Sequence, residues 1–142
     1  CNAGRQEVGQ SKIVLIDTSS WIEALRVAGR SETRQRVHRL MTEGLAAWCD
    51  MIAVELWNGA RGDYEKQKLS ELEKEITCLE ATPRVWQLAR SLAKECRQAG
   101  QTVPSPDLVI TACALSHRVG MEHCDSHIDF ILGVHAARGK DH

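Results

Sequence analysis

The sequence lacks several features that would place a protein in a familiar class. Among its 142 residues, 18 Lys and Arg are balanced by 19 Asp and Glu, so the net charge of -1 provides no overall positive field for nucleic acid. No apolar run approaches the ~18 residues that a membrane-spanning helix needs. Repeats and low-complexity segments are missing as well. We therefore expect no membrane association, and contact with nucleic acid would need a local groove or a bound metal.

Cysteine pairing is also missing. None of the six cysteines forms a C-x-x-C pair, and most lie in apolar stretches, at positions 1, 49, 78, 96, 113 and 124. Such usage is typical of reduced thiols that pack as small hydrophobic side chains in cytoplasmic proteins. The sequence therefore predicts a cytoplasmic location without a disulfide framework.

The length of the chain predicts one domain with a substantial core. The first residues, CNAGRQEVGQS, contain no hydrophobic signal core, and residues 1–11 are interpreted as a flexible leader. Residues 12–134 are interpreted as a single domain, and residues 135–142 as a flexible tail.

Short apolar runs alternate with longer helical patterns along this domain. Strands are predicted over 12–17, 45–49, 76–81 and 121–125, with a further short strand near 131–134. Helices are predicted from near Ser20, which forms a capping box with Glu23, and over 31–43, 51–61, 64–75, 83–99 and 106–119. This alternation indicates a short parallel β-sheet covered on both faces, which is a three-layer α/β/α fold.

Four acidic residues interrupt apolar patterns in which a charge is not expected. Asp17 follows the run IVLI, Glu55 lies within MIAVELWNGA, Asp107 opens the apolar helix DLVITACAL, and Asp125 ends the last of the four strands. In a parallel sheet, ligands bind outside the carboxyl ends of strands and at the adjoining helix starts. Asp17, Asp107 and Asp125 fall at such places, so we expect them to converge.

A cluster of these carboxylates would need a cation, because like charges repel one another in a partly desolvated cleft. Oxygen-rich sites of this kind suit Mg²⁺ or Mn²⁺. Two such ions about 4 Å apart can activate a water and stabilise the leaving oxygen of a phosphodiester. The hydroxyl groups of Thr18 and Ser19 are expected to orient Asp17 or a metal-bound water.

Four segments, IVLIDTSSWIEAL, AVELWNGAR, PDLVITACAL and HCDSHIDFI, occur in an order that resembles the PIN-domain nucleases, and most closely the VapC-type toxins. The resemblance covers residues 12–134. It implies a PIN-like fold and an Mg²⁺- or Mn²⁺-dependent endoribonuclease that hydrolyses RNA phosphodiesters with metal-activated water. It also implies the toxin of a toxin–antitoxin pair, a homodimer, and a small antitoxin partner that blocks the cleft.

The resemblance also assigns roles to individual residues. The catalytic and metal-binding acids that it carries over are Asp17, Glu55, Asp107 and Asp125. Thr18 or Ser19 matches the hydroxyl beside the first acid. The family often has a second acid two residues after the last one, whereas His127 stands there in this chain and Asp129 follows later. Asp129 is therefore a fifth candidate ligand that departs from the family pattern.

Each of these residues also has a simpler structural interpretation. Asp17 could cap the following helix, although Ser19 and Ser20 offer alternative caps. Asp107 could complement the dipole of its own helix. Taken one at a time, Glu55 and Asp107 would fit such roles better than a functional one. Only the complete set of acids favours a functional site.

Other conspicuous residues remain open to more than one interpretation. Trp57 and Arg61 lie four residues apart and flank Glu55, so they fit either a surface stacking pair or contacts with substrate. The group of Arg34, Arg36 and Arg39 is interpreted as a solvated face. Four possible zinc ligands match no standard zinc pattern, namely His117, His123, Cys124 and His127.

Non-enzymatic functions are the alternative class. One is an acidic pocket that holds Mg²⁺ without cleaving, as in phospho-receiver domains, and another is a catalytically silent scaffold. A receiver needs an acid pair after its first strand, whereas Thr18 follows Asp17 here. A phosphatase of the D-x-D type is excluded because residue 19 is Ser. The presence of all four acids favours an enzyme over a scaffold.

Overall fold

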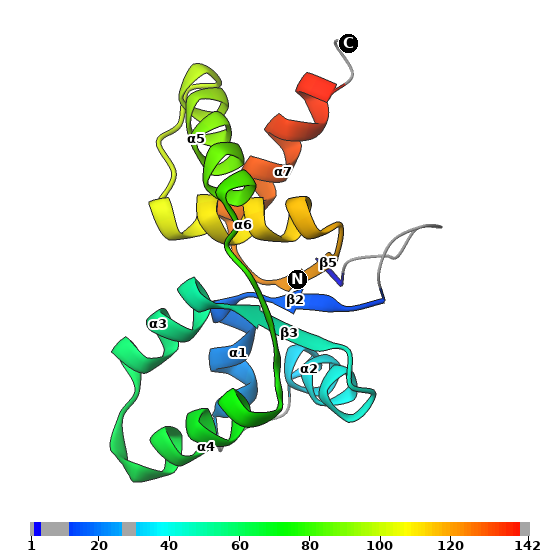
Figure 1. The fold of residues 1–142 in the computed structure, drawn as a ribbon, viewed down its shortest axis with the longest axis vertical. Coiled ribbons are helices and arrows are strands. Elements are labelled where there is room, and N and C mark those ends of the chain that lie inside the picture. The colour runs from blue at the N-terminus through cyan, green and yellow to red at the C-terminus, as the bar shows by residue number, and fades with distance from the viewer. Residues whose placement is uncertain (1, 4–11, 27–30, 140–142) are drawn as a thin grey trace.

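A five-stranded sheet forms the centre of the fold, in the order β1-β5-β2-β3-β4 (Figure 1). The structure is a computed structural model that describes residues 2–3, 12–26 and 31–139. The strands are β1 (Asn2–Ala3), β2 (Val14–Ile16), β3 (Ala46–Cys49), β4 (Thr77–Leu79) and β5 (Gly120–His123). β5, β2, β3 and β4 run parallel, and β1 pairs antiparallel with β5. The carboxyl ends of four strands therefore lie along one edge of the sheet.

Helices cover both faces of this sheet, so the predicted three-layer α/β/α fold is confirmed (Figure 1). One layer contains α1 (Thr18–Leu25), α2 (Glu32–Thr42), α3 (Asp50–Gly59) and α4 (Gly62–Glu75). The other layer contains α5 (Pro83–Gln98), α6 (Ser105–His117) and α7 (Ser126–Gly139). Across the ranges that the structure describes, none of these helices is long and apolar enough to cross a membrane.

Apolar residues in β2 and α6 explain why these elements lie at the centre. All three residues of β2, Val14 to Ile16, are buried, as expected for a strand covered on both faces. In α6 every residue from Asp107 to Ala114 is buried, because a helix that is apolar nearly all round belongs inside a protein. Asp107 is the one acid within that buried run.

The first helix begins earlier than the sequence analysis predicted. α1 starts at Thr18, and Asp17 is its N-cap, with a side chain that accepts a hydrogen bond from Ser19 N–H. The predicted capping box of Ser20 and Glu23 is therefore wrong, and Ser20 is buried within the helix. Asp17 also remains tied to the sheet, because its own N–H donates to the carbonyl of Glu122 on β5, at 2.9 Å.

The end of the chain also differs from the prediction. The short strand expected near 131–134 is part of α7, because Ile128 and Ile131 bury one face of a helix. α7 continues to Gly139, so residues 135–139 of the expected tail are helical. In the expected leader, Asn2 and Ala3 pair with β5, and residues 1 and 4–11 lie outside the described residues.

The cysteines follow the prediction at four of the described positions. Cys49, Cys96 and Cys113 are buried free thiols, and Cys78 is an exposed one. Cys124 is disulfide-bonded, so the expectation of reduced cysteines is wrong at that position.

A buried ion pair joins α2 to the sheet beside the candidate site. Glu122 on β5 is 1% exposed, and its Oε1 accepts a hydrogen bond from Nε of Arg36 at 2.8 Å. The other oxygen, Oε2, has no hydrogen-bond partner among the described residues. Arg36 therefore neutralises a buried carboxylate, and the prediction that it belongs to a solvated basic face is wrong.

We expect Arg36→Ala to lower the free energy of unfolding by about 3–5 kcal/mol, because it leaves Glu122 buried without its counter-charge. Arg39→Ala changes an exposed residue of the same helix and should have little effect. Adding Glu122→Gln to Arg36→Ala should recover part of the loss. Urea denaturation measures all three effects, and a double variant no more stable than Arg36→Ala would exclude charge as the cause.

Candidate active site

Asp17 lies where β2 ends and α1 begins, and its carboxylate is only 2% exposed. Its Oδ2 accepts hydrogen bonds from the backbone N–H of Ser19 at 3.3 Å and from the Ser19 hydroxyl at 2.8 Å. Its Oδ1 is buried and has no hydrogen-bond partner within the described part of the chain. Because buried polar atoms are normally paired, this oxygen is an acceptor that the described residues leave unused.

Glu55 enters the same region from the middle of α3. Its Oε1 accepts a hydrogen bond from the hydroxyl of Thr18 at 2.7 Å. Thr18 is the first residue of α1 and directly follows Asp17. The hydrogen bond therefore connects two acids that are 38 positions apart in the sequence through the residue between them in space.

Asp107, Asp125 and His127 form the tightest group of possible metal ligands. One ligand atom from each lies within 4.8 Å of the others. His127 Nδ1 is 3.3 Å from Asp125 Oδ1 and 3.5 Å from Asp107 Oδ2. The backbone N–H of His127 also donates to Asp125 Oδ1 at 2.7 Å. The start of α6, the loop after β5 and the start of α7 therefore meet at one point.

Electrostatic effects link this group to Asp17 and Glu55. Burial raises the pKa of Asp17, and the charge of Asp125 raises it further, although hydrogen bonds from Ser19 lower it. Burial raises the pKa of Asp107 to about 6. The charges of Asp125, Asp17 and Glu55 also raise it, while His127 lowers it. All four predicted acids therefore act on one region of space.

Asp129, the fifth candidate ligand, lies apart from this group. Its Oδ1 is 3.6 Å from Nε2 of the buried His123, and its side chain is 59% exposed. His123 Nδ1 in turn accepts a hydrogen bond from the backbone N–H of Asp125 at 3.4 Å. In this arrangement Asp129 faces His123, while His127 occupies the place beside Asp107 and Asp125.

The two residues suggested as substrate contacts lie in different surroundings. The indole N–H of Trp57 donates to Glu73 on α4, and the ring is 36% exposed. Arg61 lines a pocket that also includes Glu55. Trp57 and Arg61 do not stack on each other in the described part of the chain. Trp57 contacts Glu73, Arg61 contacts Glu65, and the cation–π contact of this region joins Lys68 to Tyr64.

His127 belongs to the group with Asp107 and Asp125, although the sequence pattern does not predict it as a ligand of Mg²⁺ or Mn²⁺. Its zinc-type spacing was uninformative, because neither His117 nor Cys124 belongs to the group around Asp107. The informative signal was its position two residues after Asp125. Once α7 begins at Ser126, a residue at that position lies in the first helical turn and faces the acid that precedes the helix.

The residues at this site fit a hard divalent cation. The unpartnered Oδ1 of Asp17 is a buried oxygen acceptor, and Asp107 and Asp125 supply further carboxylates. Oxygen ligands with a single imidazole suit Mg²⁺ or Mn²⁺, whereas structural zinc sites favour sulfur and nitrogen. A bound cation would also offset the mutual repulsion that raises the pKa of Asp107.

We expect Mg²⁺ or Mn²⁺ to stabilise the protein, by about 2.7 kcal/mol at a concentration 100-fold above the Kd, because the ligands assemble only in the folded state. Asp17→Asn should abolish most of this stabilisation. Asp63→Asn, the same change at an exposed acid of α4, should preserve it. Thermal unfolding with titrated metal measures the response, and equal responses of wild type and Asp17→Asn would remove Asp17 from the site.

Known proteins are similar to this chain in sequence or in fold. The PIN domain family matches residues 14–129. VapC ribonuclease Mb1587 of Mycobacterium bovis is 34% identical to this chain over 126 residues, which cover 86% of this chain and 93% of the relative. The solved structure of FitAB bound to an IR36 DNA fragment has a TM-score of 0.69 at 17% identity, and covers 84% of this chain and 90% of its own. A toxin-antitoxin complex from Klebsiella pneumoniae has a TM-score of 0.62 at 20% identity, covering 80% and 87%. The chain therefore belongs to the PIN-domain family.

Proposed function

We propose that this chain is the toxin of a toxin–antitoxin pair and acts as an endoribonuclease that depends on Mg²⁺ or Mn²⁺. The observation that carries the proposal is the convergence of four acids from separate elements on one region that includes an unpartnered carboxylate oxygen. RNA as the substrate is supported by the relative that is named a ribonuclease and matches over most of both chains. The toxin role is supported by the VapC name of this relative and by the fold that the chain shares with solved structures such as the toxin-antitoxin complex from Klebsiella pneumoniae.

The residues of the site divide into ligands and groups that hold the ligands. The cation would be bound by Asp107, Asp125 and His127 together with Oδ1 of Asp17. Glu55 would add a further negative charge beside these ligands. When bound, a divalent cation would supply positive charge to the scissile phosphate and lower the pKa of a water molecule.

The hydroxyl groups beside Asp17 fix the acids in place. Ser19 binds Oδ2 of Asp17 through two hydrogen bonds, which leaves Oδ1 available. Ser19 Oγ also accepts a hydrogen bond from the backbone N–H of Cys124 at 3.3 Å, immediately before Asp125. Thr18 holds Glu55 from the other side. These contacts preorganise the site, so that little rearrangement is needed when substrate binds.

In this proposal no side chain attacks phosphorus, and the residues of the site bind and orient the reactants. The oxygen of a water molecule bonds to phosphorus in line with the departing 3′ oxygen, the P–O3′ bond breaks, and the proton that the water loses is taken up by the 3′ oxygen, so the products carry a 5′ phosphate and a 3′ hydroxyl. A small antitoxin would block this site, and we propose a homodimer as the active assembly, in line with the VapC-type resemblance.

Cleavage of single-stranded RNA tests the proposal. Wild-type protein should cut RNA internally with Mg²⁺ or Mn²⁺, and EDTA should stop the reaction. The products should carry 5′ phosphates, because water and not the 2′ hydroxyl of RNA is the nucleophile. Analysis of product ends by ligation and phosphatase treatment distinguishes these ends.

Two results would contradict this mechanism. Products with 2′,3′-cyclic phosphates would indicate attack by the RNA itself, with His123 or His127 as the acid–base groups. Cleavage that persists in EDTA would separate the activity from the metal. A protein that is stabilised by metal but cuts no RNA would instead support the alternative of an acidic Mg²⁺-binding or scaffold module.

A further inference from the structure

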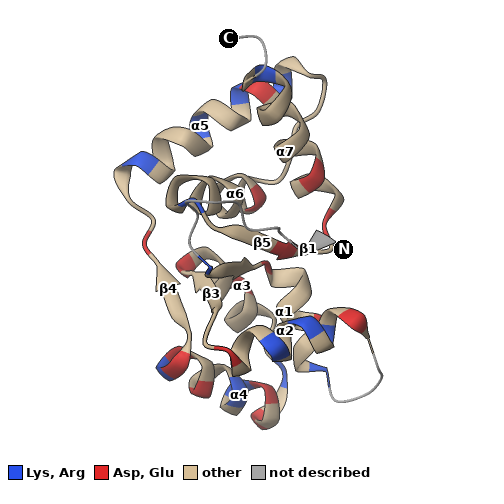
Figure 2. Cartoon of the chain, turned by 90° about the vertical axis from the view of Figure 1, so that its right-hand side faces the viewer, with Lys and Arg blue, Asp and Glu red and all other residues tan. Residues whose placement is uncertain are grey.

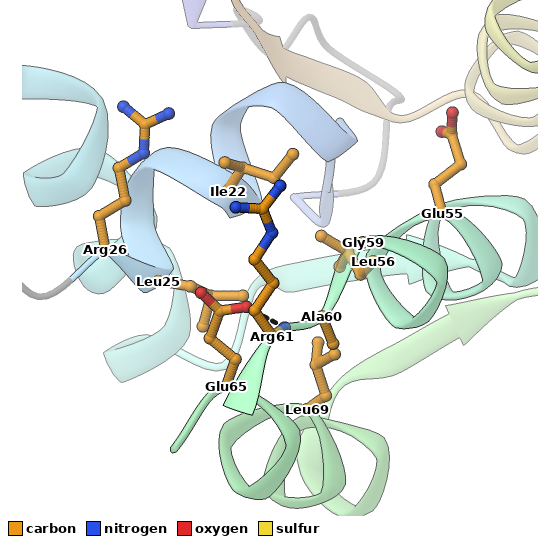
Figure 3. A pocket seen from close by; sticks show the side chains of 10 residues that line it. All are labelled: Ile22, Leu25, Arg26, Glu55, Leu56, Gly59, Ala60, Arg61, Glu65 and Leu69. Atoms are coloured by element: carbon orange, nitrogen blue, oxygen red, sulfur yellow. Dashed lines mark hydrogen bonds between the residues drawn. The ribbon is translucent and has the colours of Figure 1, made fainter. Parts of the chain in front are cut away.

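A pocket of about 420 Å³ opens beside Glu55, between α1, α3 and α4 (Figure 3). Its apolar lining comes from Ile22 and Leu25 on α1, Leu56 on α3 and Leu69 on α4. Glu55 contributes to the same lining one helical turn before Gly59. The pocket therefore adjoins the acid cluster, but its apolar side chains carry no atoms that could bind a metal.

Two guanidinium groups stand at the rim of this pocket. Arg26 follows the end of α1, and Arg61 precedes α4. Figure 3 shows that their side chains and that of Glu55 extend to the same side of the pocket. Arg26 forms an exposed ion pair with Glu23 at 3.4 Å.

Arg61 is the more available of the two. Within the described ranges its guanidinium forms no ion pair. The neighbouring acid, Glu65, accepts a hydrogen bond from the backbone N–H of Arg61 at 2.7 Å. Glu65 thereby caps the start of α4 and leaves the Arg61 guanidinium free to bind an anion. The pocket thus combines an apolar surface, a free positive charge, and a boundary with the acidic site.

The geometry points to a binding site for one nucleotide of single-stranded RNA, adjacent to the phosphate that is cleaved. The base packs on Ile22, Leu56 and Leu69, and the guanidinium of Arg61 binds the neighbouring phosphate. This inference rests on the proposed endoribonuclease function and adds a source of sequence preference to it.

Three observations favour a nucleotide. The volume lies in the ~300–1,000 Å³ range of small-ligand pockets, so it holds one splayed base and its sugar. Proteins read single-stranded RNA through splayed bases that stack on aromatic side chains or on Arg guanidinium planes, and Arg26 offers such a plane at the rim of this pocket. Arg61 supplies the phosphate with a cation next to a site that is otherwise acidic. Both acidic and basic residues occur along α4, so this helix has no continuous row of positive charges that could bind a longer stretch of RNA backbone (Figure 2). We therefore expect RNA to contact this region at the pocket.

Gly59→Phe tests the pocket directly. Gly59 lines the pocket in the last turn of α3, and a Cβ at this position would meet nothing within 4 Å, so a side chain can be added there without a clash at Cβ. Gly133→Phe is the matched control, because Gly133 on α7 is equally open and lies in the other helical layer (Figure 1).

The readout is cleavage of a random pool of single-stranded RNA, with sequencing of the product ends. Wild type should prefer certain bases at one position that flanks the cut. Gly59→Phe should lose that preference and lower kcat/KM at least about tenfold, because the added ring excludes the base from the pocket and contacts with each base contribute strongly to the binding of single strands. Gly133→Phe should retain both the preference and the rate.

Arg61→Ala gives a second readout that does not depend on filling the pocket. Removing one phosphate contact should reduce the slope of log affinity against log salt by roughly 0.7 for a single strand. Arg90→Ala, an exposed arginine on α5, should leave the slope unchanged. Affinity is measured by fluorescence anisotropy of a labelled RNA with Ca²⁺ in place of Mg²⁺.

The outcomes separate this inference from the proposed function. RNA cleavage with an unchanged base preference in Gly59→Phe, and an unchanged salt slope in Arg61→Ala, would overturn the nucleotide site while the endoribonuclease stands. That result is also the one expected if a protein segment fills the pocket. A wild-type chain that cuts no RNA would remove the proposed function, and this inference with it.

Discussion

Replacing Asp107 or Asp125 by Ala should reduce RNA cleavage by at least about 100-fold, because each change removes a candidate ligand from the group that also contains His127. Asp17→Ala should have an effect of the same size, since it removes both the unpartnered Oδ1 and the N-cap of α1. Glu55→Ala should also abolish cleavage. Initial rates on a fluorogenic RNA with saturating Mn²⁺ measure the losses.

The structure also ranks residues that the sequence pattern treats alike. Asp129→Ala should weaken cleavage far less than Asp125→Ala, because Asp129 pairs with His123 outside the ligand group. His127→Ala should reduce the apparent affinity for the metal, which higher Mn²⁺ concentrations would partly restore. Cleavage by Asp129→Ala as low as that of Asp125→Ala would show that the two acids share one role, and would overturn this ranking.

Much of the fold could be predicted because periodicity and burial agree along most of the chain. Continuous apolar residues in β2 indicate a strand covered on both faces, and the structure buries all of them. The apolar α6 is interior for the same reason. α7 was harder to predict, because a short apolar run such as residues 131–134 fits a strand or a buried helix equally well. Only packing of Ile128 and Ile131 in the core decides for the helix.

The meeting of Asp17, Asp107 and Asp125 follows from topology. A parallel sheet places the ends of β2 and β5 side by side, so acids that follow these strands must lie together. Glu55 could be included only as part of the set, since its position in mid-helix carries no such constraint. Its hydrogen bond with Thr18 depends on how α1 packs against α3, which no local pattern specifies.

Two residues show where local patterns mislead. The local pattern predicts that Arg36 is solvated like Arg34 and Arg39, because nothing nearby in the sequence indicates its partner Glu122, which lies 86 positions away. Asp17 was expected to leave capping to a serine, yet it caps α1 with Oδ2 and keeps Oδ1 without a partner. Asp17 can therefore serve both roles, because Oδ2 caps the helix and Oδ1 remains available as a metal ligand.

The acid cluster places function in conflict with stability. In the absence of metal, Asp107 loses hydration on folding and faces the negative charges of Asp125, Asp17 and Glu55. The fold therefore favours the protonated form, and the pKa of Asp107 rises from 3.8 to about 6. A carboxyl whose pKa is higher in the folded state imposes no cost below pH 3.8, where both states are protonated. The cost grows as pH rises and is complete above pH 6, where both states are charged.

Asp107→Asn should therefore stabilise the metal-free protein at neutral pH, where the wild-type carboxylate is charged. Each unit of pKa difference corresponds to ~1.4 kcal/mol, so the gain is at most roughly 3 kcal/mol. Below about pH 4 the gain should vanish, because a protonated Asp and an Asn carry the same charge. Urea denaturation in EDTA between pH 4 and pH 7.5 measures the difference in the free energy of unfolding between the two proteins.

Asp63→Asn, at an exposed acid in the first turn of α4, should give no gain at any pH. If Asp107→Asn is instead less stable across the whole range, the main role of Asp107 is structural, and the favourable dipole of α6 outweighs the repulsion within the cluster.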